Sequence, residues 1–335
     1  MEKRSRTVRD ATTGTMRFEQ YEAKPDADRW GNAQGNQHDL AVDGAFKGQT
    51  VAVLHLYVDS SFDFNLPKNA LAEKGFSTYR WISAPPPPEE LEKGLEKSSQ
   101  LWIISGSSNL LTPAHVAVIK KFYDAGHGVY IWGDNEPYYA DANVVAQALL
   151  GTQMHGNLMG DHTVGMLAGD PMKGGIKPNH LLSTGLENIY EGITIATIDQ
   201  NSGLEPLIYG SAGNLVAAYY DHGGKRAILD GGFTRLYMKW DTAGTARYVK
   251  NAAAWLVNAE RFGDAVINPE LKKVAGMTPV TSVPAMTTAA PPEMIKCPTA
   301  YSHSEDPFLS SRMGYMLLAL LAGLAILMYL PRRFR

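Results

Sequence analysis

The segment 128–145, GVYIWGDNEPYYADANVV, brings acidic, amide and phenolic side chains together after a short apolar run. The polar and aromatic members of this segment are Asp134, Asn135, Glu136, Tyr138, Tyr139, Asp141 and Asn143. The carboxylates of Asp134, Glu136 and Asp141 could form an acid–base pair, or with Asn135 an oxygen-rich site for a divalent cation. A polar turn before Pro137, followed by the first turn of a helix, would also account for them. The sequence leaves open a turn, a ligand or metal site, and a catalytic site.

A second segment, SGSSN over residues 105–109, could hold an anion with main-chain N–H groups and hydroxyls. The residues that would do so are Ser105, Gly106, Ser107 and Asn109. The segment lacks the glycine–lysine spacing of a P-loop and the G-x-S-x-G of a serine elbow. A structural loop before the proline-started helix at 112–126 is the alternative.

Three further places carry candidate ligand-binding residues. Asp161 and His162 lie in a glycine-rich segment, 156–165, that could overhang a pocket as a dyad or ligand pair, or could be a plain surface loop. Asp230 and Arg235 flank a Gly-Gly turn, where Arg235 could clamp a substrate or pair with Asp241. Asp59 follows the apolar run 50–58.

The elements that must position these residues alternate along the chain. Apolar, strand-like runs at 50–58, 77–83, 100–106 and 128–133 alternate with helical patterns such as 65–75 and 112–126. After residue 185, strand-like runs joined by short turns predict antiparallel pairing, and a helix is expected at 242–258. The pattern predicts a flavodoxin-like α/β fold, with a mostly parallel sheet, helices on both faces and an antiparallel extension. Ligands of such sheets bind outside the carboxyl ends of the strands, where most of the candidate residues lie.

The strand ending IISGSSN, the elbow after VYIWG and the closing RAILDGGFTRLY with its helix resemble the class I glutamine amidotransferase-like superfamily over residues 48–260. The resemblance implies that Gly106 matches a glycine whose N–H stabilises an oxyanion. It also implies a nucleophilic cysteine in the elbow and a histidine after the last hairpin strand, where this chain has GDNEP and GGFTRLY. The resemblance therefore favours a member without amidotransferase chemistry, used for binding or as a scaffold.

Composition narrows the function classes. The formal net charge is −3, and without a basic run the sequence does not favour nucleic-acid binding. Cys297 is the single cysteine and lies in a Pro/Thr-rich region, which excludes a disulfide framework within one chain and a thiol nucleophile in the predicted domain. The histidines lack metal-ligand spacing. We expect no cofactor, with a divalent cation as the open possibility.

The C-terminal segment MGYMLLALLAGLAILMYL, residues 313–330, has no charge and would span roughly 27 Å as a helix, enough to cross a bilayer. We therefore expect a disordered leader at 1–45, the α/β domain at 46–262, a Pro/Thr-rich tether at 263–312, a transmembrane helix at 313–330 and a basic tail at 331–335. The arginines after the helix favour a domain outside, whereas the absence of a signal-like run in the first twenty residues favours a tail anchor. The expectation is a single-pass protein whose domain faces the cytosol.

Three hypotheses follow. The leading one is a membrane-anchored module that binds a protein or small-molecule partner and does no thiol chemistry. The second is a hydrolase that uses Asp134, Glu136 or the Asp161–His162 pair, with or without a divalent cation. The third is a structural scaffold at the membrane.

Overall fold

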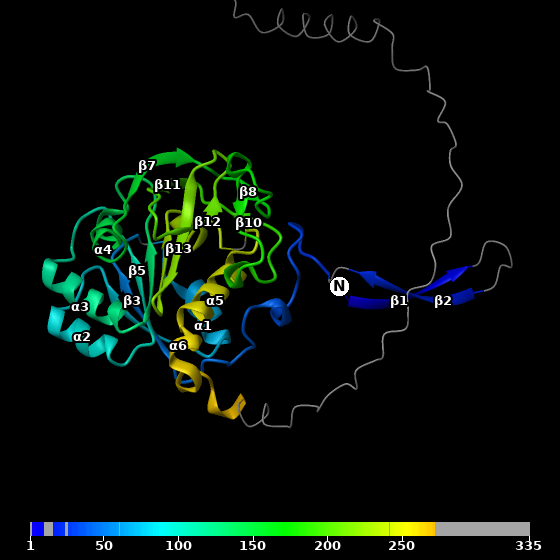
Figure 1. The fold of residues 1–335 in the computed structure, drawn as a ribbon, viewed down its shortest axis with the longest axis horizontal. Coiled ribbons are helices and arrows are strands. Elements are labelled where there is room, and N and C mark those ends of the chain that lie inside the picture. Colours follow the sequence, from blue (N-terminus) through cyan, green and yellow to red (C-terminus); the bar gives the residue numbers. More distant parts are fainter. Residues whose placement is uncertain (1, 10–15, 24–25, 60, 241, 272–335) are drawn as a thin grey trace, which may run out of the picture. The chain divides into compact units, whose positions relative to one another are not determined.

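The computed structural model describes residues 2–9, 16–23, 26–59, 61–240 and 242–271 (Figure 1). The central feature of the body is an eight-stranded sheet with the order β4-β3-β5-β6-β14-β13-β12-β9. Its strands are β3 (Thr50–His55), β4 (Ser77–Ile82), β5 (Gln100–Ile104), β6 (Gly128–Trp132), β9 (Gly175–Ile176), β12 (Glu205–Tyr209), β13 (Leu215–His222) and β14 (Lys225–Asp230). Strands β3 to β6 and β14 pair in parallel, and β13, β12 and β9 extend the sheet by antiparallel pairing. The predicted mostly parallel sheet with an antiparallel extension is confirmed.

The parallel strands end in register. His55 lies opposite Ile104, Ile104 opposite Trp132, and Trp132 opposite Asp230. The segments that follow these four residues therefore leave the sheet at the same edge. This carboxyl edge is where the sequence places most of its candidate ligand-binding residues.

Helices cover both faces of the sheet, as predicted (Figure 1). Helices α1 (Asn65–Glu73) and α5 (Thr245–Leu256) pack on one face, and α2 (Pro88–Leu95), α3 (Pro113–Asp124) and α4 (Ala140–Leu150) pack on the other. Alternate residues of β3 face opposite sides of the sheet, since Val53 belongs to the same buried cluster as Leu71 of α1, and Leu54 to the same cluster as Leu91 of α2. A strand buried on both faces explains the near-continuous apolar runs in the sequence.

Smaller elements complete the body. Strand β7 (Met154–Met159) pairs with β11 (Thr194–Ile198), and β8 (Thr163–Val164) pairs with β10 (Ile189–Tyr190), all antiparallel. The remaining short elements are the helix α6 (Ala259–Phe262) and the 3-10 turns η1 (Asn36–His38), η2 (Pro171–Lys173), η3 (Leu181–Ser183), η4 (Phe233–Arg235) and η5 (Gly263–Val266). Antiparallel pairing after residue 185 is confirmed, although β10 and β11 pair with earlier strands and not with each other.

The prediction of a disordered leader over residues 1–45 is wrong for much of this segment. Strands β1 (Glu2–Arg9) and β2 (Met16–Ala23) form a hairpin. Residues 26–45 are bonded to the body, where the Asp39 side chain is 1% exposed and forms ion pairs with Lys74 (2.9 Å) and Lys250 (2.8 Å). The polar composition of this segment suggested disorder. The sequence did not reveal its order, because the partners of Asp39 lie far away along the chain.

The domain also extends beyond the predicted C-terminal boundary at residue 262. The first residues of the predicted tether belong to the body, because the N–H of Asn268 donates to the carbonyl of Ala45 at 2.8 Å. The rest of the tether, the predicted transmembrane helix at 313–330 and the basic tail lie outside the described residues. Among the residues that are described, none belongs to a helix long and apolar enough to cross a membrane.

Candidate functional site at the carboxyl edge of the sheet

Asp134 lies two residues after the end of β6 and is buried, with 6% of its surface exposed. Its Oδ1 atom has no hydrogen-bond partner among the described residues. Burial raises the pKa of Asp134 to about 8, against the opposing effects of the Asn135 N–H and the Arg235 charge. Asp134, the first of the three acidic residues of the predicted site, is therefore enclosed and favours its protonated form at neutral pH.

An aromatic cluster lies over the same edge and consists of Tyr57, Phe62, Tyr138, Phe233 and Tyr237. The ring centroid of Tyr57 is 5.6 Å from that of Tyr138 and 4.9 Å from that of Phe233. Burial, followed by the charge of Asp59, raises the pKa of Tyr57 to about 12, and Asp134 is among the charges that contribute. The rings fill the space into which the segments after β3, β6 and β14 converge.

Sequence reasoning identified only Tyr138 of this cluster. The other four rings follow the ends of β3 and β14. Only polar residues after each strand were considered as candidates, so these aromatic residues were missed although they lie in the same positions. Asp59, which was predicted, lies at the rim, where its carboxylate accepts hydrogen bonds from the Tyr237 hydroxyl (3.0 Å) and the Ser61 N–H (2.8 Å).

Asp230 and Arg235 form an ion pair that is completely buried. The Oδ2 atom of Asp230 accepts hydrogen bonds from the hydroxyls of Tyr130 (3.2 Å) and Tyr248 (3.0 Å). Arg235 also donates to the carbonyl of Glu191 at 3.0 Å. Asp241, the partner of Arg235 considered from the sequence, lies outside the described residues. With its guanidinium enclosed, Arg235 is not placed to clamp a ligand.

Asp141 and Ser105 join the 105–111 segment to the start of α4. One oxygen of Asp141 accepts hydrogen bonds from the N–H groups of Leu110 and Leu111, both at 2.8 Å. The Ser105 hydroxyl accepts one from the N–H of Ala142 at 3.1 Å. Burial raises the pKa of Asp141. In the structure both side chains accept hydrogen bonds from backbone N–H groups of this region.

The structure does not assemble the predicted cation site. Asp134 is enclosed and Asp141 is bonded to loop N–H groups, while Glu136 is exposed. The amide oxygen of Asn135 accepts a hydrogen bond from the Thr194 hydroxyl at 2.8 Å. Within the described part of the chain, no group of three or more His, Cys, Asp or Glu residues could hold a metal ion.

Three predicted residues, Ser107, Asn109 and Glu136, do come together in a shallow open depression of about 440 Å³. Its other lining residues are Pro137, Tyr139, Ala140, Asn143 and Val144. The depression joins the segment after β5 to the start of α4, at the carboxyl edge. Its lining contains one carboxylate and no basic side chain. Gly106 is beside it, and a Cβ at that position would lie 2.7 Å from the carbonyl oxygen of Leu56.

Asp161 and His162 do not act as a pair. Asp161 accepts a hydrogen bond from the Tyr190 hydroxyl at 2.5 Å and lies 3.4 Å from the ammonium of Lys239. The N–H of His162 donates to the carboxylate of Glu191 at 3.1 Å. Glu191, a buried residue that sequence reasoning missed, also accepts a hydrogen bond from the Ser211 hydroxyl at 2.8 Å. It ties two surface loops together.

No protein-family model matches the chain, and no curated protein matches it either. Several solved structures do. A GMP synthase subunit from Thermoplasma acidophilum is 8% identical, with 67% of this chain and 98% of that chain covered and a TM-score of 0.38. A ThuA-like protein from Parabacteroides merdae is 11% identical, with coverages of 63% and 90% and a TM-score of 0.40. The glutaminase domain of Trypanosoma brucei CTPS, with bound acivicin, is 8% identical, with coverages of 64% and 94% and a TM-score of 0.34. Similarity at this level assigns neither an activity nor a ligand to the chain.

Proposed function

We propose that the chain is an amidotransferase-like module that binds a ligand or partner at the carboxyl edge of its sheet and does no thiol chemistry. The proposal rests on the residues that stand at two positions of this chain. At these positions the class I glutamine amidotransferase-like superfamily has its catalytic cysteine and histidine. The elbow after β6 presents Asp134, which is enclosed, and the segment after β14 contributes Arg235 to a buried ion pair. The aromatic cluster occupies the space between these segments and β3.

The depression lined by Ser107, Asn109 and Glu136 is the binding surface we propose. Its exposed carboxylate, its hydroxyl and amide groups and its lack of basic side chains favour a ligand with hydrogen-bond donors, either neutral or cationic. An open surface of this kind fits a segment of a partner protein or a small polar molecule.

We further propose that residues 313–330 hold this module at a membrane as a single-pass anchor, with the domain on the cytosolic side. The uncharged length of the segment supports the anchor.

The test uses the full chain. We expect no release of ammonia from L-glutamine, and an increase in melting temperature with at least one compound from a panel of polar amines, basic peptides and neutral sugars. Glu136→Gln should abolish that increase. Glu187→Gln, which removes an exposed carboxylate elsewhere, should preserve it. Glutamine hydrolysis that depends on the 105–109 or 134–141 segments would overturn the proposal.

A hydrolase is the second candidate because the raised pKa of Asp134, about 8, gives a protonated carboxyl at neutral pH. A general acid requires that form. The two candidates separate on Asp134→Asn, since this change would abolish a hydrolytic activity but leave ligand binding at Glu136 in place.

A further inference from the structure

Strand β4 forms one edge of the eight-stranded sheet. On its inner side, the N–H of Ser77 donates to the carbonyl of Gln49 and that of Ser83 to the carbonyl of His55, both at 2.9 Å. Peptide groups alternate in direction along a parallel strand. Those of Thr78, Arg80 and Ile82 therefore point away from β3, toward the open edge. An edge of this kind can accept another strand.

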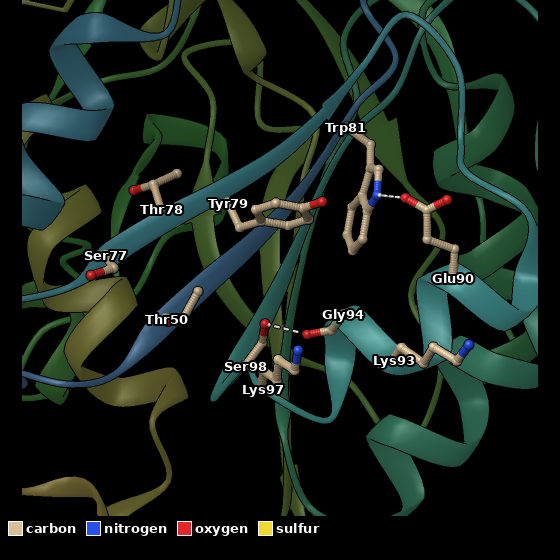
Figure 2. Close-up of a pocket in the computed structure, with 10 residues that line it drawn as sticks. All are labelled: Thr50, Ser77, Thr78, Tyr79, Trp81, Glu90, Lys93, Gly94, Lys97 and Ser98. Atoms are coloured by element: carbon tan, nitrogen blue, oxygen red, sulfur yellow. Dashed lines mark hydrogen bonds between the residues drawn. The ribbon is translucent and has the colours of Figure 1, made fainter.

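A groove of about 510 Å³ runs between this edge and α2 (Figure 2). Tyr79 and Trp81 extend into it from β4, with their ring centroids 4.9 Å apart. Tyr79 is 49% exposed. The indole N–H of Trp81 lies 3.4 Å from a carboxylate oxygen of Glu90, which fixes one wall of the groove. Figure 2 shows this contact at one end and Lys97 and Ser98 at the other.

A glycine of α2 shapes the groove. Gly94 of α2 faces Trp81 so closely that a Cβ would lie 2.6 Å from the indole ring. The glycine therefore lets the aromatic wall and the helix approach each other without closing the groove.

The α2 side of the groove carries two lysines, Lys93 and Lys97, and one carboxylate, Glu90, which lies against the Trp81 indole. Lys93 and Lys97 are exposed and line the groove, and neither forms an ion pair with a described residue. By contrast, Lys120 and Lys121 on α3 are paired with Asp124 and Glu92. Four residues of helix rise about 6 Å, and two residues of a strand span about 6.6 Å. Acidic side chains two residues apart on an extended peptide would therefore match the spacing of the two lysines.

We propose that β4 and α2 bind an extended acidic peptide of a partner protein by strand addition, with an acid-x-acid pattern facing Lys93 and Lys97. The open strand edge supplies main-chain hydrogen bonds, and the lysines select the peptide by charge. An acidic oligosaccharide would use the lysines and the aromatic rings but not the strand edge. A second copy of the chain would add its own two lysines to the same groove. This site is separate from the depression at the carboxyl edge, so it does not depend on the function proposed there.

The test measures the fluorescence anisotropy of labelled peptides with the full chain. The probe has the sequence TVEVEVT, and its neutral control has the sequence TVQVQVT. We expect the probe to bind and the control to bind much more weakly. The double change Lys93→Glu and Lys97→Glu should weaken probe binding by roughly tenfold or more, because two attractions become repulsions. The matched double change Lys68→Glu and Lys173→Glu, at exposed positions away from the groove, should leave it unchanged.

A second variant tests the strand pairing itself. Thr78→Pro removes an N–H that β3 does not use, and proline is accepted at an edge strand on that side. It should abolish probe binding while the melting temperature shows that the body is folded. Absence of binding by the wild-type chain would overturn the proposal, as would binding that persists in a folded Thr78→Pro chain. Binding of an oligouronate that survives Thr78→Pro, with no binding of the peptide, would assign the groove to a carbohydrate instead.

Discussion

Burial keeps the Asp134 carboxyl neutral in the folded chain at physiological pH. The folded pKa is about 8, whereas the unfolded chain would titrate near the ordinary value of 3.8. Between these two pH values the unfolded state loses its proton and the folded state keeps it. Stability from this group is therefore fully present below the unfolded pKa and falls as pH rises toward about 8.

Replacing this carboxyl gives a prediction at the scale of one residue. At pH 5, already above the unfolded pKa, the free energy of unfolding of Asp134→Asn should exceed that of the wild type by on the order of 1–2 kcal/mol. At pH 8.5 it should exceed the wild type by on the order of 3–5 kcal/mol, because the amide never ionises. Urea unfolding at the two pH values measures both differences, with Glu187→Gln as the exposed control. A variant that follows the wild type at both pH values would mean that the carboxyl is solvated.

At the scale of elements, the buried side chain of Asp39 joins the segment 26–45 to both α1 and α5. Asp39 contacts Lys74 of the α1 end and, on α5, Arg247 (2.8 Å) and Lys250. Burial by itself would raise the pKa of Asp39, but the hydrogen bonds from Lys250, Lys74 and Arg247 outweigh it and lower the pKa. The stability that Asp39 contributes is thus present above its unfolded pKa and lost as the pH falls.

Removing this charge should loosen the whole segment. Asp39→Asn leaves the three cations without their shared partner and should cost about 3–5 kcal/mol in unfolding free energy at pH 7. Asp43→Asn is the matched control, since Asp43 contacts the same Lys74 at 2.6 Å but is half exposed, and should cost about 1 kcal/mol or less. Urea unfolding gives both values, and hydrogen exchange should show faster exchange over residues 36–45 in Asp39→Asn alone. Equal losses in the two variants would contradict the fastening role of Asp39.

At the scale of the whole molecule, the proposed anchor predicts where the chain lies in the cell. The full chain expressed in cells should stay with the membrane pellet after alkaline carbonate extraction, because an apolar helix of eighteen residues partitions into the bilayer. A chain ending at residue 312 should move to the supernatant. Protease added to intact cells should leave the domain protected if it faces the cytosol. Full extraction of the complete chain by carbonate would remove the anchor from the proposal.

The sequence by itself determined the order and type of the main elements. Alternating apolar runs and capped helical patterns are local properties, so β3 to β6 and helices such as α3 could be predicted within a few residues. The end of α3 is an example, since Gly126 adopts a φ of 100° that terminates the helix. The sequence also showed that the body has no thiol, because the single cysteine lies at position 297.

Only the tertiary structure decided what the polar side chains do. Asp39 and Arg247 are 208 residues apart, and Asp230 shares its carboxylate with Tyr130, 100 residues away. No local pattern encodes such pairings, since they depend on which segments the sheet brings together. The same applies to the aromatic cluster, whose rings follow three different strands. Local periodicity therefore fixed the scaffold, whereas burial and long-range contacts divided the candidate residues between structural roles and the open depression.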